Sequence, residues 1–209
     1  MNATGLKKVE LRCISGANNN KFYRMEEQSN GTFTATYGRI GVSSKSITKS
    51  MSDWDKVYRD KTNKRGEESY TDVTHLLHVS TAPQTIVSTL SPSLQEFVNL
   101  LQGYAKTNVH SNYEVDASAV TPQMVSTAQS LLNSLLKVKT KEEVNKNLLE
   151  LYKTIPRKMK KVQNHLIQTV NVDTTWLNKT IQEEQDNLDS MSSLIKQVTN
   201  GTIIHTNPL

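Results

Sequence analysis

Lysine and arginine side chains alternate with aromatic side chains through the first third of the sequence, and this combination suits one kind of chemistry. Cations neutralise phosphates and release counterions, while aromatic rings stack on bases or sugars. The pattern favours nucleic-acid binding, and the alternative is an ordinary basic surface over core aromatics. The residues are Lys21, Arg24, Arg39, Lys45, Lys49, Lys56, Arg59, Lys61, Lys64 and Arg65, interleaved with Phe22, Tyr23, Tyr37 and Tyr58.

The positive charge of the chain is concentrated in the same region. The 209 residues carry a net charge of +5, and residues 1–70 hold 13 Lys/Arg against 8 Asp/Glu. Residues 71–209 hold 12 of each and are neutral. This distribution excludes a uniformly basic coat and predicts a basic module joined to a neutral one.

Other kinds of site have little support in the sequence. It contains no GxGxxG, P-loop, HExxH or GxSxG motif, and its five histidines are scattered. We expect the single cysteine, Cys13, to be a buried structural thiol, and no internal disulfide. We expect Glu183, Glu184 and Asp186 to lie on a solvated helix face.

The targeting signals are equally sparse. The N-terminal residues have no long apolar run, so we expect no signal peptide. No stretch approaches the length of a membrane helix. One cysteine fits a reducing compartment, and we expect an intracellular protein. The basic cluster at 157–161 is interpreted either as a nuclear import signal or as the basic start of a helix.

The first part of the chain reads as strands followed by one helix. Apolar residues alternate with polar ones around Leu11, and Ser29-Asn30-Gly31 is a hairpin turn signal. From Ser52 the spacing becomes helical, with Trp54, Val57 and Tyr58 on the apolar face, up to a stop near Gly66. We expect strands at 9–13, 20–28, 32–41 and 45–50 in a small unit of residues 1–78.

The second part reads as helices after a linker. Residues 79–92 hold Ser, Thr and two Pro but no charge, which is typical of a linker. Beyond it, apolar residues recur at helical spacing. The fold class is therefore α+β, a small antiparallel-sheet domain followed by an all-α helical bundle. The expected helices lie near 94–101, 121–135, 144–155, 162–170 and 177–198. In the second of these, Thr121 is the expected N-cap and Pro122 the first helical residue.

Three blocks of the first unit resemble the WGR domain. Residues 37–41, Tyr-Gly-Arg-Ile-Gly, are similar to its central motif, with Tyr in place of Trp. Residues 20–23, Asn-Lys-Phe-Tyr, resemble its second strand. Trp54, Tyr58 and the run Asp-Lys-Thr-Asn at 60–63 resemble its helix and ending. The resemblance covers residues 8–72.

Blocks of the second part resemble the helical regulatory domain that follows the WGR domain in poly(ADP-ribose) polymerases. They occur in the family's order after the WGR-like unit, although the residue after Pro156 is Arg157 where the family has His. The blocks are residues 94–101, 113–116, 121–132, 151–156 and 187–191. On this resemblance the helical domain spans 93–209.

The resemblance implies recognition of DNA strand breaks near a phosphorylated 5′ end, in the DNA damage response and DNA repair. An arginine can contact a terminal phosphate through two N–H groups. Arg39 is the implied phosphate clamp, Gly38 allows close approach, and Tyr37 is a stacking group or, alternatively, a core aromatic. The weaker DNA-binding candidates are Asn20, Lys21, Lys45 and Lys61.

The helical unit is implied to act as a regulatory switch. Asp189 and Ser193 match positions that face the NAD pocket of the polymerase family, although Ser193 stands where that family usually has an acid. The sequence leaves no place for the catalytic domain, so we expect no ADP-ribose transfer by this chain alone, despite its relation to NAD⁺ ADP-ribosyltransferases. No cofactor is expected in this chain, because NAD belongs to the missing domain, and no metal site is expected.

The expected partners are DNA with strand breaks and a catalytic ADP-ribosyltransferase domain or subunit, with no membrane. The expected location is the nucleus for a eukaryotic protein and the host-cell interior for a viral one. The alternative function is a non-enzymatic module, in which the WGR-like unit and the helical bundle bind protein partners only.

Overall fold

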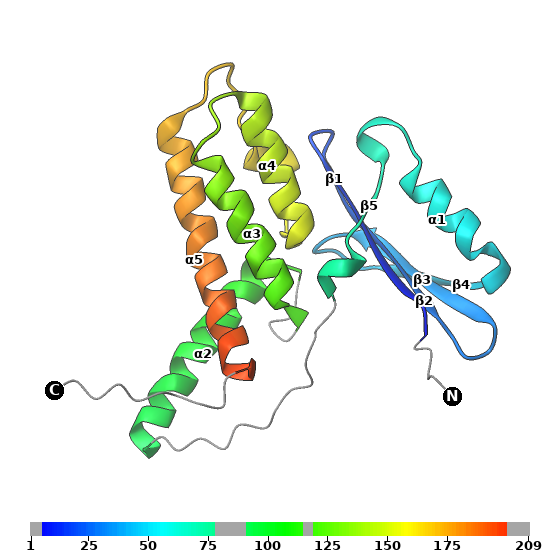
Figure 1. Ribbon diagram of the computed structural model, residues 1–209, viewed down its shortest axis with the longest axis horizontal. Coiled ribbons are helices and arrows are strands. Elements are labelled where there is room, and N and C mark those ends of the chain that lie inside the picture. The colour runs from blue at the N-terminus through cyan, green and yellow to red at the C-terminus, as the bar shows by residue number, and fades with distance from the viewer. Residues whose placement is uncertain (1–5, 78–90, 115–118, 200–209) are drawn as a thin grey trace.

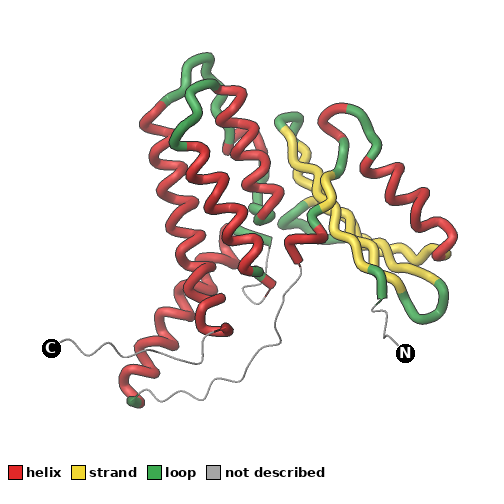
Figure 2. The backbone as a smooth tube through the Cα atoms, in the orientation of Figure 1, coloured by secondary structure: helices red, strands yellow, loops and turns green. Residues whose placement is uncertain are grey.

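The structure, a computed structural model, describes residues 6–77, 91–114 and 119–199. A β-sheet lies between helix α1 on one side and a bundle of helices on the other (Figure 1). Figure 2 shows the same division, with strands in yellow between red helices. The α+β class predicted from the sequence is confirmed.

The sheet is antiparallel with the strand order β4-β3-β2-β1-β5. Its turns use residues with positive φ, such as Gly31 at 78° in the expected hairpin. The four predicted strands are present, and the two-residue β5 was not predicted. The strands are β1 (Lys8–Ser15), β2 (Asn19–Glu27), β3 (Thr32–Arg39), β4 (Lys45–Ser50) and β5 (Thr71–Asp72).

One face of the sheet packs against α1 (Trp54–Thr62). The Trp54 ring meets the Phe33 ring edge-on, with 5.1 Å between the ring centroids. Trp54 and Val57 are the buried residues of α1, as its spacing predicted. The helix starts after a short 3-10 turn, Met51–Asp53, so it begins two residues later than expected from Ser52.

Two helices of the bundle begin at threonine residues that cap them. Thr121 Oγ1 accepts a hydrogen bond from Met124 N–H at 3.1 Å, ahead of a proline at the first helical position, as predicted. Thr140 Oγ1 accepts a hydrogen bond from the Glu143 N–H at 3.3 Å, and its hydroxyl donates to the Glu143 carboxylate at 2.8 Å, so Thr140 caps α4. The helices are α2 (Pro92–Asn112), α3 (Pro122–Leu135), α4 (Lys141–Thr154) and α5 (Thr174–Thr199).

The helix expected at 162–170 was wrong. Only a 3-10 turn, Val162–His165, forms there. The Asn145 side chain accepts from the Ile167 N–H at 2.8 Å and donates to its carbonyl at 3.0 Å. These bonds satisfy both backbone groups of Ile167 from a neighbouring helix, so the chain beyond the 3-10 turn does not need α-helical hydrogen bonds. Val170 is 90% exposed and contributes nothing to an apolar face.

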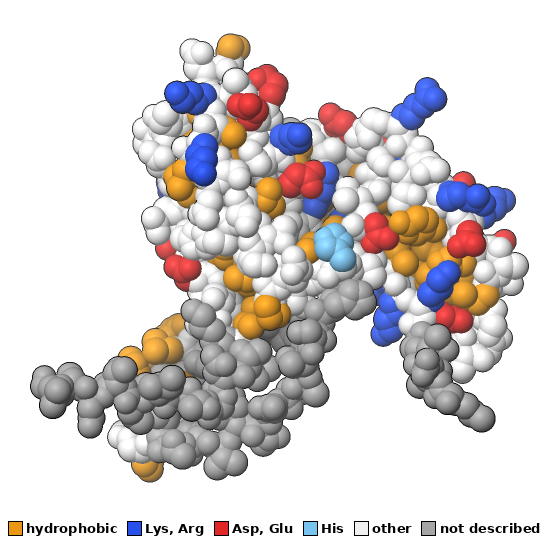
Figure 3. Space-filling model, in the orientation of Figure 1, with side chains coloured by type: hydrophobic (Ala, Val, Ile, Leu, Met, Phe, Trp, Pro, Cys, Tyr) orange, Lys and Arg blue, Asp and Glu red, His pale blue; other side chains and the backbone are white. Residues whose placement is uncertain are grey.

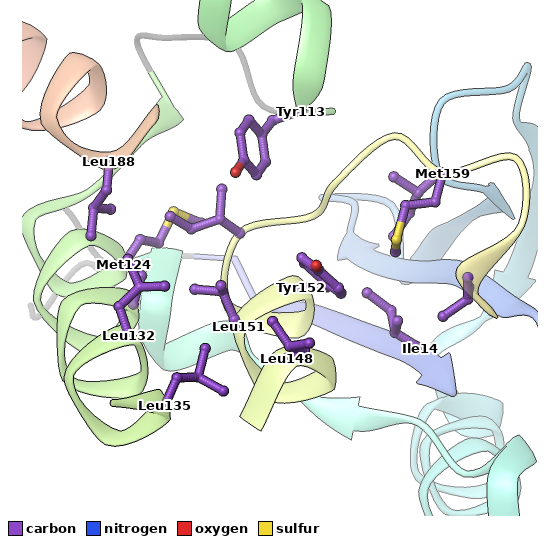
Figure 4. Packing of buried hydrophobic residues seen from close by; sticks show 14 of the residues in the cluster. Ile14, Tyr113, Met124, Leu132, Leu135, Leu148, Leu151, Tyr152, Met159 and Leu188 are labelled. Carbon is purple, nitrogen blue, oxygen red and sulfur yellow. The ribbon is translucent and has the colours of Figure 1, made fainter. Parts of the chain in front are cut away.

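The second face of the sheet packs against the bundle through a shared hydrophobic cluster. Ile14 and Ile40 of the sheet unit belong to the same buried cluster as the residues between the helices. Figure 4 shows Ile14 beside Met159, with Tyr152 between the sheet and the helical core. The linker expected at 79–92 lies outside the described residues except at Ser91 and Pro92, where α2 begins.

Candidate nucleic-acid interface

A groove between the sheet and α1 combines stacked tyrosines with lysines. The Tyr23 and Tyr37 rings are stacked, with their centroids 5.5 Å apart and their planes at 18°. Lys61 Nζ lies 4.5 Å from the Tyr23 ring centroid, within cation–π range. We call this the lysine–tyrosine groove. It has a volume of about 400 Å³ and is lined by Tyr23, Tyr37, Ile47, Lys49, Val57, Asp60, Lys61 and Lys64.

The lysines of this groove act on each other electrostatically. Burial lowers the pKa of Lys61, and repulsion from Lys64, Lys49 and Lys21 lowers it further, while Asp60 opposes the shift. Within the described part of the chain, Lys49 and Lys61 form no ion pair. A cluster of unpaired cations around aromatic rings has the composition that binds a nucleic-acid backbone.

Three of the predicted site residues lie on this face of the sheet. Lys45 stands directly across from Tyr37 in the β3–β4 register, and Lys21 lies two residues before Tyr23, which pairs with Tyr37 in the β2–β3 register. Tyr37 is half-buried, so it is neither a fully enclosed core aromatic nor a free ring. The structure thus brings Tyr37, Lys21, Lys45 and Lys61 to one side of the molecule.

Arg39 points toward the helical unit. Its guanidinium donates hydrogen bonds to the carbonyl oxygens of Met159 at 3.2 Å and Lys160 at 2.7 Å. It also donates to both oxygens of Asn18, at 3.0 and 3.2 Å. All four acceptors are neutral oxygens, so no carboxylate among them compensates the positive charge of Arg39. Contact of Arg39 with a DNA phosphate stays a prediction.

Asn20 and Gly38 also serve the protein's own packing. Asn20 is fully buried and donates to the carbonyls of Arg157 at 3.2 Å and Met159 at 3.4 Å. A Cβ atom at Gly38 would lie 3.2 Å from the Ser44 Cα, so the close approach there is to the chain itself. These contacts are all within the protein, and DNA binding by Asn20 and Gly38 stays a prediction.

Sequence reasoning named Lys49, Lys64 and Tyr23 only as part of a basic and aromatic region. The signal that identifies them as site residues is the two-residue period of strands. Because β4 pairs in register with β3, Lys45 and Lys49 must lie on the same face as Tyr37. Lys64 follows the end of α1, and its pairing with Glu68 at 3.5 Å leaves it on the rim of the groove.

The bundle contains a buried polar triad that the sequence did not reveal. Glu184 is only 4% exposed and accepts hydrogen bonds from Tyr113 and Arg157. Burial raises the pKa of Glu184, and the Arg157 charge and the Tyr113 hydroxyl oppose the rise. The solvated face expected for Glu184 was wrong: it falls in step with Ile181 and with the later apolar residues of α5.

The residues implied as regulatory lie elsewhere on α5. Asp189 and Ser193 are exposed, and each bonds within its own helix, Asp189 to Gln185 at 2.9 Å and Ser193 to the Ser190 carbonyl at 2.7 Å. Their regulatory role stays a prediction.

Two kinds of site find no support among the described residues. No group of three or more His, Cys, Asp or Glu side chains there could hold a metal ion. No described helix is long and apolar enough to cross a membrane. The single cysteine, Cys13, is buried as predicted, and burial raises the pKa of its thiol.

Comparison with known proteins identifies the first unit. Residues 8–72, which form the sheet and α1, match the WGR domain family. The first unit is therefore a WGR domain, and WGR domains generally bind nucleic acids. The chain is also similar to uncharacterized protein 101L of Invertebrate iridescent virus 6. The two are 34% identical over 196 residues, which cover 90% of this chain and 80% of the viral protein, so this chain belongs to the same family.

Proposed function

We propose that this protein binds DNA at strand breaks, and that the lysine–tyrosine groove of the WGR domain contacts the backbone near a 5′-phosphorylated end. The observation that carries the proposal is the cluster of unpaired lysines around the Tyr23–Tyr37 stack. A broken end exposes a terminal base and sugar that an intact duplex keeps stacked. A half-buried ring such as Tyr37 offers a surface for such a group.

The charge distribution supports the same side of the molecule. In Figure 3 the helical unit carries Lys/Arg and Asp/Glu side chains intermixed, in keeping with its neutral sequence. The excess charge of the first 70 residues belongs to the WGR domain. Long-range attraction would therefore turn this domain toward DNA, with a strong dependence on salt.

The helical unit, in this proposal, is a regulatory domain of the poly(ADP-ribose) polymerase type that acts on a catalytic ADP-ribosyltransferase domain or subunit. Support comes from the order of its sequence blocks after a WGR domain and from its packing on the sheet. Asp189 and Ser193 would face that partner. The similarity to an iridescent virus protein favours the interior of a host cell as the place of action.

The decisive measurement is fluorescence anisotropy with a nicked duplex that carries a 5′ phosphate. Lys49→Gln/Lys61→Gln should reduce the slope of log K against log salt by about 1.8, since each lost phosphate contact changes it by about 0.9. Lys137→Gln/Lys139→Gln, which removes two exposed lysines from the connection between α3 and α4, is the matched control. Equal binding by both double variants would contradict the groove as the DNA site.

The end preference needs a separate comparison. Wild-type protein should bind the nicked duplex more tightly than the same duplex sealed. The Tyr37→Leu variant should lose most of this difference in affinity, because it lacks the ring that stacks on the terminal nucleotide in our proposal. Loss of a stacked base costs about 1–3 kcal/mol. Equal affinity for sealed and nicked DNA would refute recognition of breaks while leaving DNA binding intact.

A second candidate function is a protein-interaction module, and one observation favours it. The N-terminal half of α2 exposes a cluster of large apolar side chains, an arrangement typical of protein–protein contacts. In Figure 1 this half of α2 extends below the other helices. Phe97→Ser should abolish binding to a protein partner and leave DNA affinity unchanged. The exposed residues are Leu94, Phe97, Leu100, Leu101 and Tyr104, each at least 45% exposed.

A further inference from the structure

The basic cluster at 157–161 belongs to the helical unit in sequence but lies against the WGR domain in space. Arg39 holds the Met159 and Lys160 carbonyls, and Asn18 Oδ1 accepts from Val162 N–H at 2.9 Å. The segment forms no α-helix, so the basic helix start expected there was wrong. Its backbone is instead fixed by hydrogen bonds from the strand ends and turns of the sheet.

The five side chains of this cluster divide into three that are engaged and two that are free. Arg157 pairs with buried Glu184. Lys158 donates to the His110 carbonyl at 2.6 Å and faces Glu114, and the Met159 side chain is buried. The two remaining residues, Lys160 and Lys161, are exposed and form no ion pair with any described residue.

Arg39 connects these two lysines to the lysine–tyrosine groove. Lys61 is repelled by Lys21, and Lys21 stands across from Arg39 in the β2–β3 register. The Arg39 guanidinium in turn donates to the Lys160 carbonyl at 2.7 Å. Since the hydrogen-bond acceptors of Arg39 are neutral, its charge adds to the potential at this junction. Positive charge therefore continues from the groove across the domain boundary.

We propose that Lys160 and Lys161 form a second DNA contact, which continues the basic surface of the WGR domain onto the helical unit and neutralises phosphates of the same duplex. This inference rests on the proposed function, because it assumes that DNA occupies the WGR domain. A nuclear import signal is the less suitable interpretation of the cluster, since a linear signal needs accessible basic side chains and the Arg157 side chain is only 13% exposed and paired with Glu184.

A contact of this kind has a consequence for regulation. Arg39 of the WGR domain and the end of α2 both hold segment 157–161, and Arg157 is bonded to α5 through Glu184. A DNA contact at Lys160 and Lys161 would therefore act on a backbone segment that is bonded to both the sheet and α5. In this arrangement the helical unit senses DNA through a direct contact, in addition to any signal from the WGR domain.

The test compares charge-matched double variants on the nicked duplex. Lys160→Gln/Lys161→Gln should reduce the salt slope by about 1–2, because up to two phosphate contacts are lost. Lys137→Gln/Lys139→Gln removes the same charge from the exposed connection between α3 and α4 and should leave the slope unchanged. Thermal unfolding of each variant verifies that these exposed changes leave the fold intact.

The outcomes separate the two proposals. If Lys160→Gln/Lys161→Gln matches the control while Lys49→Gln/Lys61→Gln lowers the slope, the second contact is refuted and the groove stands. If Lys160→Gln/Lys161→Gln lowers the slope and the groove variant does not, DNA contacts this segment but the proposed groove is wrong. If wild-type protein does not bind the duplex, both proposals fail.

Discussion

The Arg12 guanidinium donates a hydrogen bond to the backbone carbonyl of Thr154 at 2.8 Å, and the same nitrogen donates to the Lys153 carbonyl at 2.6 Å. These carbonyls lie in the last turn of α4, where no further helical N–H can reach them. A cation there also interacts favourably with the helix dipole. Arg12 thus joins strand β1 of the sheet to the end of a bundle helix through a buried charge.

Arg12→Met should destabilise the chain by about 3 kcal/mol, because two buried carbonyls and Glu10 lose a charged partner. Burial lowers the pKa of Arg12 to about 10 and the Glu10 charge opposes this, so the group is still protonated at neutral pH. The measurement is urea unfolding at pH 7. Lys8→Gln is the control, since Lys8 pairs with Glu26 at the surface, where both side chains are exposed (69% and 38%) and such a pair is worth less than about 1 kcal/mol. Equal effects of the two changes would show that the cap on α4 contributes nothing.

Glu184→Leu should be strongly destabilising, by about 3–5 kcal/mol, because it leaves the Arg157 charge buried without its partner. The double variant Glu184→Leu/Arg157→Met should recover much of this loss, since no uncompensated charge is left. A double-mutant cycle from unfolding free energies measures the coupling. Additive effects of the two single changes would contradict a direct interaction between these side chains.

Stability should fall as the pH is lowered from 7 toward 5, in part because of His165. Burial lowers the pKa of His165 below its ordinary value of 6.5, and repulsion from Arg157 adds to the shift. The unfolded chain therefore takes up a proton at a pH where the folded chain does not, and stability is lost as the pH falls through 6.5. His165→Gln should show a shallower fall than wild type over this range. A parallel pH dependence of the two proteins would exclude His165 as a source.

Gly41→Ala should destabilise the chain by about 1–2 kcal/mol, because Gly41 has a φ of 81° that costs other residues energy. The new Cβ would also lie 3.1 Å from Lys158 Cγ, so the change presses on segment 157–161. Gly103→Ala, in the open interior of α2, should instead stabilise by about 0.5–1 kcal/mol. Thermal unfolding compares the two, and the same sign for both would contradict the role of positive φ at Gly41.

The secondary structure was largely predictable from local signals. Alternation around Leu11 predicted β1, and the turn at Gly31 predicted the antiparallel hairpin of β2 and β3. Thr121 with the proline after it predicted the start of α3. The failure at 162–170 has a tertiary cause, because the Asn145 side chain satisfies the Ile167 backbone from a neighbouring helix. The spacing of apolar residues carries no information about such a hydrogen bond.

The candidate site was only partly predictable. The sequence indicated a basic and aromatic region, and strand period could have grouped Lys45 and Lys49 with Tyr37. Nothing in the spacing showed that Arg39 would direct its N–H groups to a segment more than 100 residues away. Hydrogen bonds of this kind depend on which backbone carbonyls the fold leaves free.

By itself, the sequence determined the α+β class, the strands, most of the helices and the concentration of positive charge in the first third. These features depend on neighbours along the chain and on composition. Only the tertiary structure decided that Glu184 is buried with Arg157, that Arg12 caps α4, and that Lys160 stands beside the WGR domain. The reason is that the partners of a buried charge are chosen by the packing of distant elements, because a desolvated ion must find its compensation wherever the fold supplies it.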